Sequence, residues 1–326
     1  MIRGIGVYES NSFDPYRNLA AEQFLLENMA EERCILYLWQ NENTVVIGRN
    51  QNPWKECRTA LLEEEGGHLA RRLSGGGAVF HDLGNLNFTF LMPQADFDVD
   101  RQLTVIQKAV ELCGLETERS GRNDVLVQGR KFSGNAFYKN GRQAYHHGTL
   151  LVNVDKDKLG RYLSPSKAKL QSKGVDSVRS RVANLQDYAP EITVPVLKQA
   201  LIRAFAEVYG ENVELLSENQ LDQEKIDSLR QQYESWNWRF GQSVGFSISY
   251  EDRFPWGGIQ LCLQVKNGII DQAKVYTDAM DWTLAEAVET VLAGCEFQKD
   301  ALLGRLTEST CEEVRQMAES VCQGLF

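Results

Sequence analysis

The sequence predicts an α+β protein with a large first domain and a small second one. Short apolar runs bounded by turn residues, which are typical of strands, occur among amphipathic stretches that are typical of helices. From about residue 243 the pattern starts again with a strand pair of its own. We therefore expect a large domain over residues 1–242, a linker at about 243–250 and a small α+β domain over 251–326.

The first part of the chain predicts two helices with a pair of strands between them. Asp14 precedes a proline, as at many helix starts, and residues 18–26 carry apolar side chains at helical spacing. We expect this helix to serve core packing alone. Residues 35–39 and 44–48 are short apolar runs joined by four polar residues, which indicates a hairpin, and residues 55–65 follow as a helix.

The middle of the chain predicts further helices and a second hairpin. An Asn-Gly turn at 140–141 leads into a returning strand at 143–154. A strand is also expected at 125–128, and amphipathic helices are expected at 99–113, 194–209 and 223–236.

The last part of the chain predicts a small unit of its own. Apolar and polar residues alternate over 259–265, and an Asn-Gly turn at 267–268 leads into a strand at 269–276. Helices at 283–292 and 310–322 complete this unit.

Composition limits the classes of function. The formal net charge of −10 argues against a general binder of nucleic acid or of anionic membranes. The chain has no run of 18 apolar residues and no signal-peptide core at its amino terminus, so we expect a cytoplasmic protein. The seven cysteines are scattered, which suits free thiols in a reducing compartment. The four histidines lack zinc-site spacing, and we expect no structural metal.

Residues 71–85 form the most informative stretch. Arg71 and Arg72 supply guanidiniums, and the glycines at 75–77 let a ligand approach the backbone. Strands at 78–80 and 86–91 follow as a predicted hairpin. This combination indicates a pocket for an anionic, partly elongated ligand, and a flexible glycine loop beside a surface arginine pair is the alternative.

Three polar residues after this stretch are further candidates. Asn123 and Asp124 stand at the mouth of a strand, where they would hold a magnesium ion or a ribose, or else form an Asx turn without any ligand. Lys131 stands at the start of the next strand, from which its ammonium would reach a ligand or remain a solvated charge.

The adjacent histidines 146 and 147 must point to opposite faces of their strand. At most one of them therefore faces the pocket. We favour His147, because Gly148 beside it allows close approach of the backbone. A core histidine bonded to a backbone carbonyl is the alternative for either residue.

A basic stretch interrupts this acidic protein at 158–181. Seven basic residues face one acidic residue there, which leaves a charge of about +6. With a proline, a glycine and several serines, the stretch is predicted to be at least partly a mobile loop. It would serve either as a flap that closes over phosphates or as a solvated basic surface.

Several ordered stretches together resemble the signature blocks of bacterial lipoate-protein ligases. The blocks stand at 71–85, 121–124, 130–134, 146–151 and 177–182, and the likeness continues to the Phe-x-Trp-Gly-Gly run at 254–258. The resemblance implies a catalytic domain of mixed and antiparallel sheets flanked by helices, related to biotin-protein ligases, with a small carboxy-terminal domain. It also implies ATP-dependent activation of lipoate to lipoyl-AMP and transfer of the lipoyl group to a lysine of an acceptor protein.

The same resemblance implies roles for individual residues. Lys131 would be the catalytic residue, in contact with both ATP and lipoate, and Asp124 would hold Mg²⁺. The nucleotide would bind Arg72, Gly77, Ala78, Val79, Phe80, Asn123 and Asp124, and lipoate would bind Ser74, Gly75, Gly76 and His147. The stretch at about 162–185 would fold over the adenylate, and the small domain would rotate between the two half-reactions.

The expected substrates are lipoate, ATP and Mg²⁺, and the expected acceptors are lipoyl domains. These would belong to a glycine cleavage carrier protein or to the E2 subunit of a 2-oxoacid dehydrogenase. The alternatives are an ATP-independent octanoyl or lipoyl transferase, a biotin-protein ligase and a lipoate-binding module. A transferase of the cysteine type would need a thiol near the pocket, and no cysteine occurs between Cys113 and Cys262.

Overall fold

The larger part of the protein is built on an eight-stranded mixed sheet. The computed structural model describes residues 2–120, 124–163, 182–210, 212–240, 248–266 and 268–326. The strand order is β11-β1-β2-β6-β10-β9-β8-β7, with β1 parallel to both of its neighbours and the remaining pairs antiparallel. The strands are β1 (Gly4–Glu9), β2 (Arg33–Trp39), β6 (Asn85–Pro93), β7 (Glu118–Ser120), β8 (Asp124–Val127), β9 (Arg130–Lys139), β10 (Gln143–Leu151) and β11 (Val213–Leu216).

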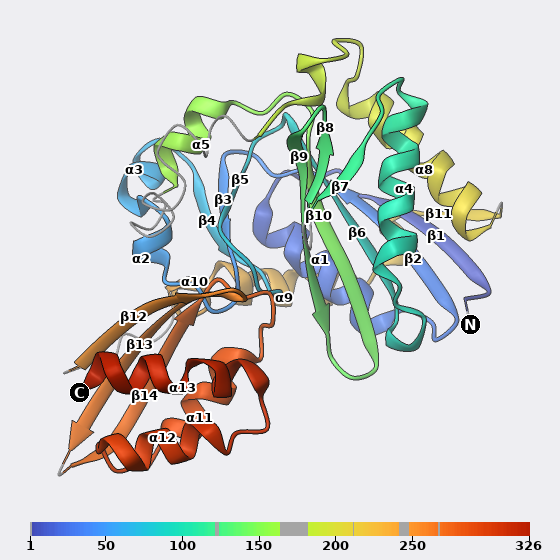
Figure 1. Ribbon diagram of the computed structural model, residues 1–326. Coiled ribbons are helices and arrows are strands. Elements are labelled where there is room, and N and C mark those ends of the chain that lie inside the picture. Colours follow the sequence, from blue (N-terminus) through green and yellow to red (C-terminus); the bar gives the residue numbers. More distant parts are fainter. Residues whose placement is uncertain (1, 121–123, 164–181, 211, 241–247, 267) are drawn as a thin grey trace.

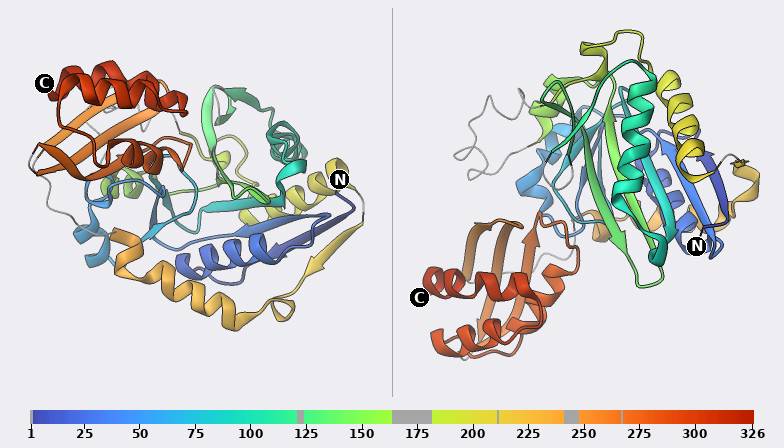
Figure 2. Two further views of the ribbon diagram at one scale, coloured as in Figure 1. Left: turned by 90° about the horizontal axis from the view of Figure 1, so that it is seen from below. Right: turned by 45° about the vertical axis from the view of Figure 1, so that its right-hand side comes forward.

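Helices cover both faces of this sheet (Figures 1 and 2). On one face α1 (Pro15–Asn28) packs in one apolar cluster with side chains such as Tyr37 and Tyr145, and α9 (Gln223–Glu234) lies beside α1. On the other face α4 (Val99–Leu112) and α8 (Val194–Tyr209) bury a second apolar core. The predicted helices at 99–113, 194–209 and 223–236 are therefore confirmed.

A smaller three-stranded sheet stands beside the large one in Figure 1. It has the order β4-β3-β5, formed by β3 (Thr44–Ile47), β4 (His68–Arg71) and β5 (Val79–His81). Its core includes Val45, Leu69 and Phe80. The short helices around it are α2 (Pro53–Glu56), α3 (Thr59–Glu64), α5 (Lys156–Tyr162) and α10 (Trp236–Phe240).

Two of the predicted hairpins are wrong, although their strands exist. Strand β2 pairs with β1 and β6 in the large sheet, whereas β3 pairs with β4 and β5 in the small one. Likewise β5 pairs with β3 and not with β6. Short polar connections of this kind cross between sheets as readily as they reverse a chain, because the residues at 40–43 lack the Asn-Gly dipeptide that specifies a tight hairpin.

The single helix expected at 55–65 is also wrong, because the structure has two short helices there. Cys57 between them has extended backbone and forms a bridge with Leu163, and the Arg58 amide donates to the Tyr162 carbonyl. The backbone at this point is therefore used to fasten the end of α5. By contrast, the hairpin predicted around 140–141 is confirmed as β9 and β10.

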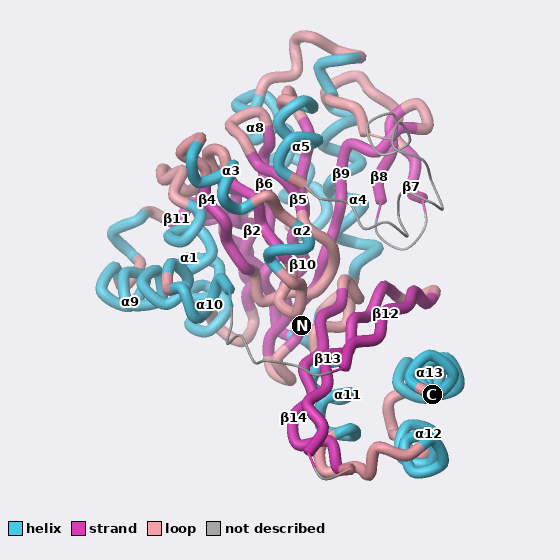
Figure 3. Tube along the Cα trace, turned by 90° about the vertical axis from the view of Figure 1, so that its left-hand side faces the viewer, coloured by secondary structure: helices cyan, strands magenta, loops and turns pink. Residues whose placement is uncertain are grey.

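The carboxy-terminal part, from residue 248, has its own sheet and core (Figure 3). Strands β12 (Ile248–Phe254), β13 (Gly257–Lys266) and β14 (Ile269–Thr277) form an antiparallel sheet, which confirms the pair predicted at 259–276. The helices packed on it are α11 (Leu284–Leu292), α12 (Lys299–Thr307) and α13 (Glu312–Leu325). The domain boundary stays a prediction, because residues 241–247 lie outside the described ones.

In the described part of the chain, no helix combines the length and the apolar character needed to cross a membrane.

The start of α1 is defined by Asp14, as the sequence predicts. Its carboxylate accepts hydrogen bonds from the amides of Tyr16 and Arg17, and its other oxygen lies 2.6 Å from Arg230 Nε of α9. One side chain thus caps α1 and joins it to α9.

We expect Asp14→Ala to lower the free energy of unfolding by about 1–2 kcal/mol, because a helix cap and a half-buried ion pair are lost together. Asp14→Asn keeps an oxygen for the cap and loses only the charge, so its loss should be smaller. Urea denaturation of the three proteins measures both effects. Equal stability of Asp14→Ala and the unaltered protein would contradict this account of α1.

Candidate active site

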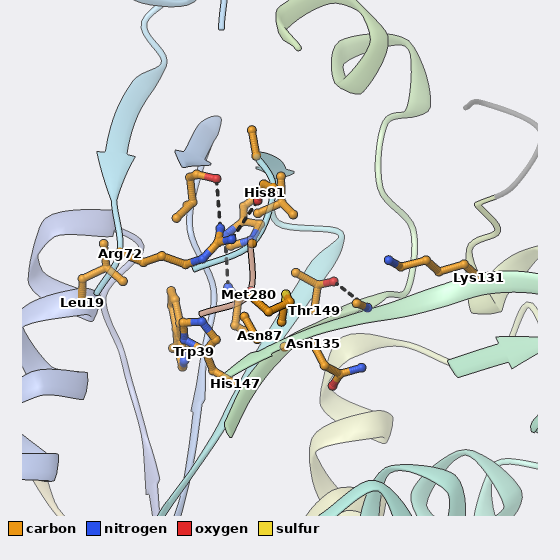
Figure 4. Close-up of a pocket in the computed structure, with 18 residues that line it drawn as sticks. Leu19, Trp39, Arg72, His81, Asn87, Lys131, Asn135, His147, Thr149 and Met280 are labelled. Carbon is orange, nitrogen blue, oxygen red and sulfur yellow. Dashed lines mark hydrogen bonds between the residues drawn. The ribbon is translucent and has the colours of Figure 1, made fainter. Parts of the chain in front are cut away.

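A pocket lies between the small sheet and the inner strands β2, β6, β10 and β9 of the large sheet (Figure 4). Its lining comes from both sheets, from α1 and from the segment after β14. The space between the lining atoms, open mouth included, is about 700 Å³, which suits a small-molecule site. The lining residues are Leu19, Trp39, Val46, Arg72, Gly76, Gly77, Ala78, Val79, His81, Asn87, Lys131, Gly134, Asn135, Ala136, His147, Gly148, Thr149 and Met280.

The guanidinium of Arg72 shapes the glycine-rich loop that forms one wall. It donates to the carbonyls of Val46, Gly75 and Gly77 and to the hydroxyl of Ser74, at distances of 2.8–3.2 Å. The side chain is buried, and desolvation lowers the pKa of Arg72 to about 10, so it is still cationic at neutral pH. One Nη1 hydrogen is left without an acceptor among the described residues.

A second wall is held by a chain of buried hydrogen bonds. Ser74 Oγ lies 2.8 Å from His147 Nε2, and His147 Nδ1 lies 2.9 Å from Glu22 Oε1. The same Glu22 oxygen accepts from Thr89 Oγ1 at 2.7 Å. This chain joins the glycine-rich loop, β10, α1 and β6, so it fixes the imidazole of His147 at the pocket wall.

Lys131 stands at one end of the pocket with its ammonium near the surface. Its Nζ lies 2.6 Å from Asp124 Oδ1 on the neighbouring strand β8, and both side chains are about one third exposed. Its backbone carbonyl accepts from the amide of Ala183 at 2.9 Å. The basic stretch between Leu163 and Val182 lies outside the described residues, but the chain that follows it is attached beside Lys131.

The carboxy-terminal part closes the pocket from a third side. The Gly76 amide donates to the Ala279 carbonyl at 2.8 Å, and the side chain of Met280 lines the pocket. Asn50 adds a bond from its Nδ2 to the Trp282 carbonyl at 2.6 Å. Gly76 has a positive φ of 86°, which glycine adopts without strain. The glycine-rich loop and the residues around Asn50 therefore both contact the carboxy-terminal part of the chain.

The other two arginines near this loop do not line the pocket. Arg71 donates to the backbone carbonyls of Trp238, Arg239, Gly48, Arg49 and Gln51. Burial lowers the pKa of Arg71 to about 10. The guanidinium of Arg49 lies over the rings of Trp238 and Trp282, 5.3 Å from each centroid. The interpretation of Arg71 as a second anion-binding fork is therefore wrong, since its donors bind the protein itself.

Two family profiles match most of this chain. The profile of the lipoyl protein ligase A/B catalytic domain matches residues 14–206, and that of the bacterial lipoate protein ligase C-terminus matches residues 243–320. The chain belongs to the lipoate-protein ligase family. The resemblance that the sequence motifs indicate is thus confirmed, and so is the predicted α+β fold.

Solved structures similar to this ligase cover the same architecture. LipL1 of P. falciparum, in complex with lipoate, is 29% identical, with 98% of this chain and 100% of that chain covered and a TM-score of 0.86. The bi-partite lipoate protein ligase of Thermoplasma acidophilum is 25% identical over 76% of this chain and 100% of that chain, with a TM-score of 0.63. A lipoate-protein ligase A bound with ATP is 24% identical, with 74% of this chain and 99% of that chain covered. Its TM-score of 0.61 shows a common fold.

The pocket gathers most of the candidate residues of this ligase. Arg72, Gly76, Gly77, Ala78, Val79, Lys131 and His147 line it. Ser74 lies behind the wall, bonded to His147, and Gly75 packs against the backbone of Ala279. Phe80 is buried in the core of the small sheet. Asp124 forms an ion pair with Lys131, which lines the pocket. Asn123 lies outside the described residues. Their roles toward substrates stay predictions.

The prediction that one of the two adjacent histidines faces the pocket is confirmed. His147 lines the pocket, whereas His146 lies on the opposite face between Gln102 and Asn135. Gly148 permits this close packing, because a Cβ on it would lie 2.7 Å from the Gly134 carbonyl oxygen.

Sequence reasoning missed several parts of the ligase pocket. The first helix was expected to serve the core alone, yet its Leu19 lines the pocket and its Glu22 holds His147. An acidic residue amid an otherwise apolar helix face was the available signal. Met280 carried no local signal, because only the folded chain brings it to the glycine-rich loop.

We expect Gly75→Ala to raise the KM of the ligase for lipoate. A Cβ at this position would lie 2.4 Å from the Ala279 carbonyl oxygen and 2.5 Å from that of Met280. The segment that carries Met280 must move, at a cost of about 1–3 kcal/mol, which corresponds to a rise in KM of roughly tenfold or more. Steady-state lipoylation kinetics measure it.

Gly4→Ala is a matched control, because nothing lies within 4 Å of a Cβ added there. An unchanged KM in Gly75→Ala would mean that the carboxy-terminal part does not form a wall of the occupied pocket.

Proposed function

We propose that this ligase activates the carboxyl group of free lipoate with ATP and transfers the lipoyl group to a lysine of a lipoyl-domain acceptor. The observation that carries the proposal is the ammonium of Lys131 at the open end of a largely apolar pocket. An apolar chain ending in a carboxylate would match this polarity. The similar proteins bound with lipoate and with ATP support the same substrates.

The first half-reaction would join lipoate to AMP. A carboxylate oxygen attacks the α-phosphorus of ATP, the bond to the β-phosphate breaks, and pyrophosphate leaves. Both reactants are anions, so the site must offset their repulsion. The Lys131 ammonium would do so from a position between the α-phosphate and the acyl oxygen. Because Asp124 now accepts from this ammonium, the carboxylate also fixes its direction.

The second half-reaction would form the amide. The acceptor lysine, as a neutral amine, attacks the acyl carbon, AMP leaves, and the amine loses a proton to solvent. Lys131 would stabilise the developing charge on the acyl oxygen in this step as well. The acceptor class is a lipoyl domain, either of a glycine cleavage carrier or of an E2 subunit. The structural neighbour from Thermoplasma acidophilum is described together with its E2 lipoyl domain, which supports the second of these.

The nucleotide would lie along residues 77–80, whose backbone N–H and C=O groups follow the glycine-rich loop. Arg72 would add positive charge to the wall, with its one remaining Nη1 hydrogen directed to a phosphate. Among the described residues no three His, Cys, Asp or Glu side chains gather as a metal cluster. Mg²⁺ would bind mainly phosphate oxygens and water. Asp124 would add one carboxylate, and the ion would offset phosphate charge.

A transferase that uses a cysteine is not favoured. All seven cysteines are free, but none is among the described residues that line the pocket. Free lipoate, as would be salvaged from outside the cell, is the proposed donor, and a transferase without a cysteine is the alternative.

We expect lipoate to trigger pyrophosphate release from ATP and Mg²⁺ in the absence of any acceptor. Lys131→Ala should lower this release by roughly a hundredfold or more, because one charged donor at the reacting atoms is lost. Lys139→Ala is the matched control, since Lys139 is exposed on the same strand and lies over the ring of Phe97.

Parallel reactions with octanoate, biotin and no acid define the specificity. If none of the acids triggers pyrophosphate release, the ATP-dependent step is ruled out and the transferase hypothesis is favoured.

A further inference from the structure

The side chain of His81 is buried at the pocket with its protonation state fixed by neighbours. Its Nδ1 lies 3.2 Å from Asn41 Nδ2. The orientation of the Asn41 amide is set, because its Oδ1 accepts from Asn18 Nδ2, which also donates to the carbonyls of Ser12 and Gln40. Asn41 therefore donates to His81, and Nδ1 must be the unprotonated acceptor.

The more distant Asn87 agrees with this assignment. Its Oδ1 accepts from Asn85 Nδ2 at 2.9 Å, so its own Nδ2 is the atom that lies 3.5 Å from His81 Nδ1. Desolvation by burial lowers the pKa of His81 to about 3, with Arg72 adding to the effect. The ring is therefore neutral at physiological pH and carries its one proton on Nε2.

This Nε2–H is a buried donor that has no acceptor among the described residues. His81 is 3% exposed, lines the pocket, and its Nε2 makes no hydrogen bond in the described part of the chain. Buried N–H groups are almost always paired, so an unpaired one in a pocket wall indicates an acceptor on the ligand. His146 gives the contrast: it is equally buried, but both of its nitrogens have partners.

The position of His81 indicates which part of the ligand it meets. In Figure 4, Lys131 is at one end of the pocket, and His81 lies away from it, with its ring centroid 6.2 Å from that of Trp39. If the carboxyl group lies at Lys131, as in the proposed function on which this step rests, the far end of the acid reaches His81. In lipoate that end is a dithiolane, whose sulfurs are weak acceptors, whereas in octanoate it is a methyl group without any.

We propose that His81 Nε2–H donates a hydrogen bond to a dithiolane sulfur and so makes the ligase prefer lipoate over octanoate. A site that contains a polar group for its substrate rejects an analogue that leaves the group unpaired. Because sulfur is a weak acceptor, the preference should be modest, roughly tenfold in the ratio of kcat/KM values.

Two variants of His81 separate the two ring nitrogens. In His81→Asn the amide oxygen stands near the place of Nδ1 and still accepts from Asn41, but the donor at the Nε2 position is lost. In His81→Gln the longer side chain carries an amide donor to about the place of Nε2. We expect the lipoate-to-octanoate ratio to fall roughly tenfold in His81→Asn and to be largely kept in His81→Gln.

The assay is pyrophosphate release with each acid alone, and with both in competition. His146→Asn is the matched control and should leave the ratio as it is, because His146 lies on the other face of the sheet. An unchanged ratio in His81→Asn, with both acids active, would overturn this inference alone. If neither acid triggers pyrophosphate release in the unaltered protein, the proposed function is overturned, and this inference with it.

A measurement without any substitution covers the case in which His81→Asn does not fold. In protein labelled with ¹⁵N-histidine, the Nε2–H signal of His81 should shift when lipoate binds and shift less when octanoate binds. Equal shifts with the two acids would overturn the proposal.

Discussion

The buried guanidinium of Arg72 is the interaction on which the site depends. A charge removed from water must be paired or fully hydrogen-bonded, and here the carbonyls of Val46, Gly75 and Gly77 surround it. This requirement curls the glycine-rich loop around the guanidinium. Ser74 extends the same network to His147 and Glu22. One cation thereby determines the shape of the loop and, through it, the wall of the pocket.

The curled loop then receives the carboxy-terminal part of the chain. Glycine at position 75 leaves room for the backbone of Ala279, and the amide of Gly76 binds it. Met280 enters the pocket as a result. The two parts have separate cores, so their contact is made mainly by a few polar groups and aromatic rings, including the tilted rings of Tyr138 and Trp282. Such a contact is compatible with the rotation between half-reactions that the family resemblance implies, which stays a prediction.

Local signals in the sequence predicted more than long-range ones. The Asp14 cap, the long amphipathic helices, the Asn-Gly hairpins and the side of the strand on which His147 lies follow from neighbouring residues alone. The partners of β2 and β3 do not, because pairing depends on segments far apart in the chain. For the same reason the Arg71 guanidinium was expected to face an anion, although carbonyls from the segments at 48–51 and 238–239 surround it. Motif order identified the family, which no single motif specifies.

Lipoate is expected to lie with its carboxyl group at Lys131 and its dithiolane at His81. A crystal structure of the ligase with lipoate bound tests this claim most directly. A carboxylate oxygen should lie within hydrogen-bonding distance of Lys131 Nζ, and a sulfur should lie next to His81 Nε2. Lipoate bound in the reverse direction, or outside the pocket, would contradict it.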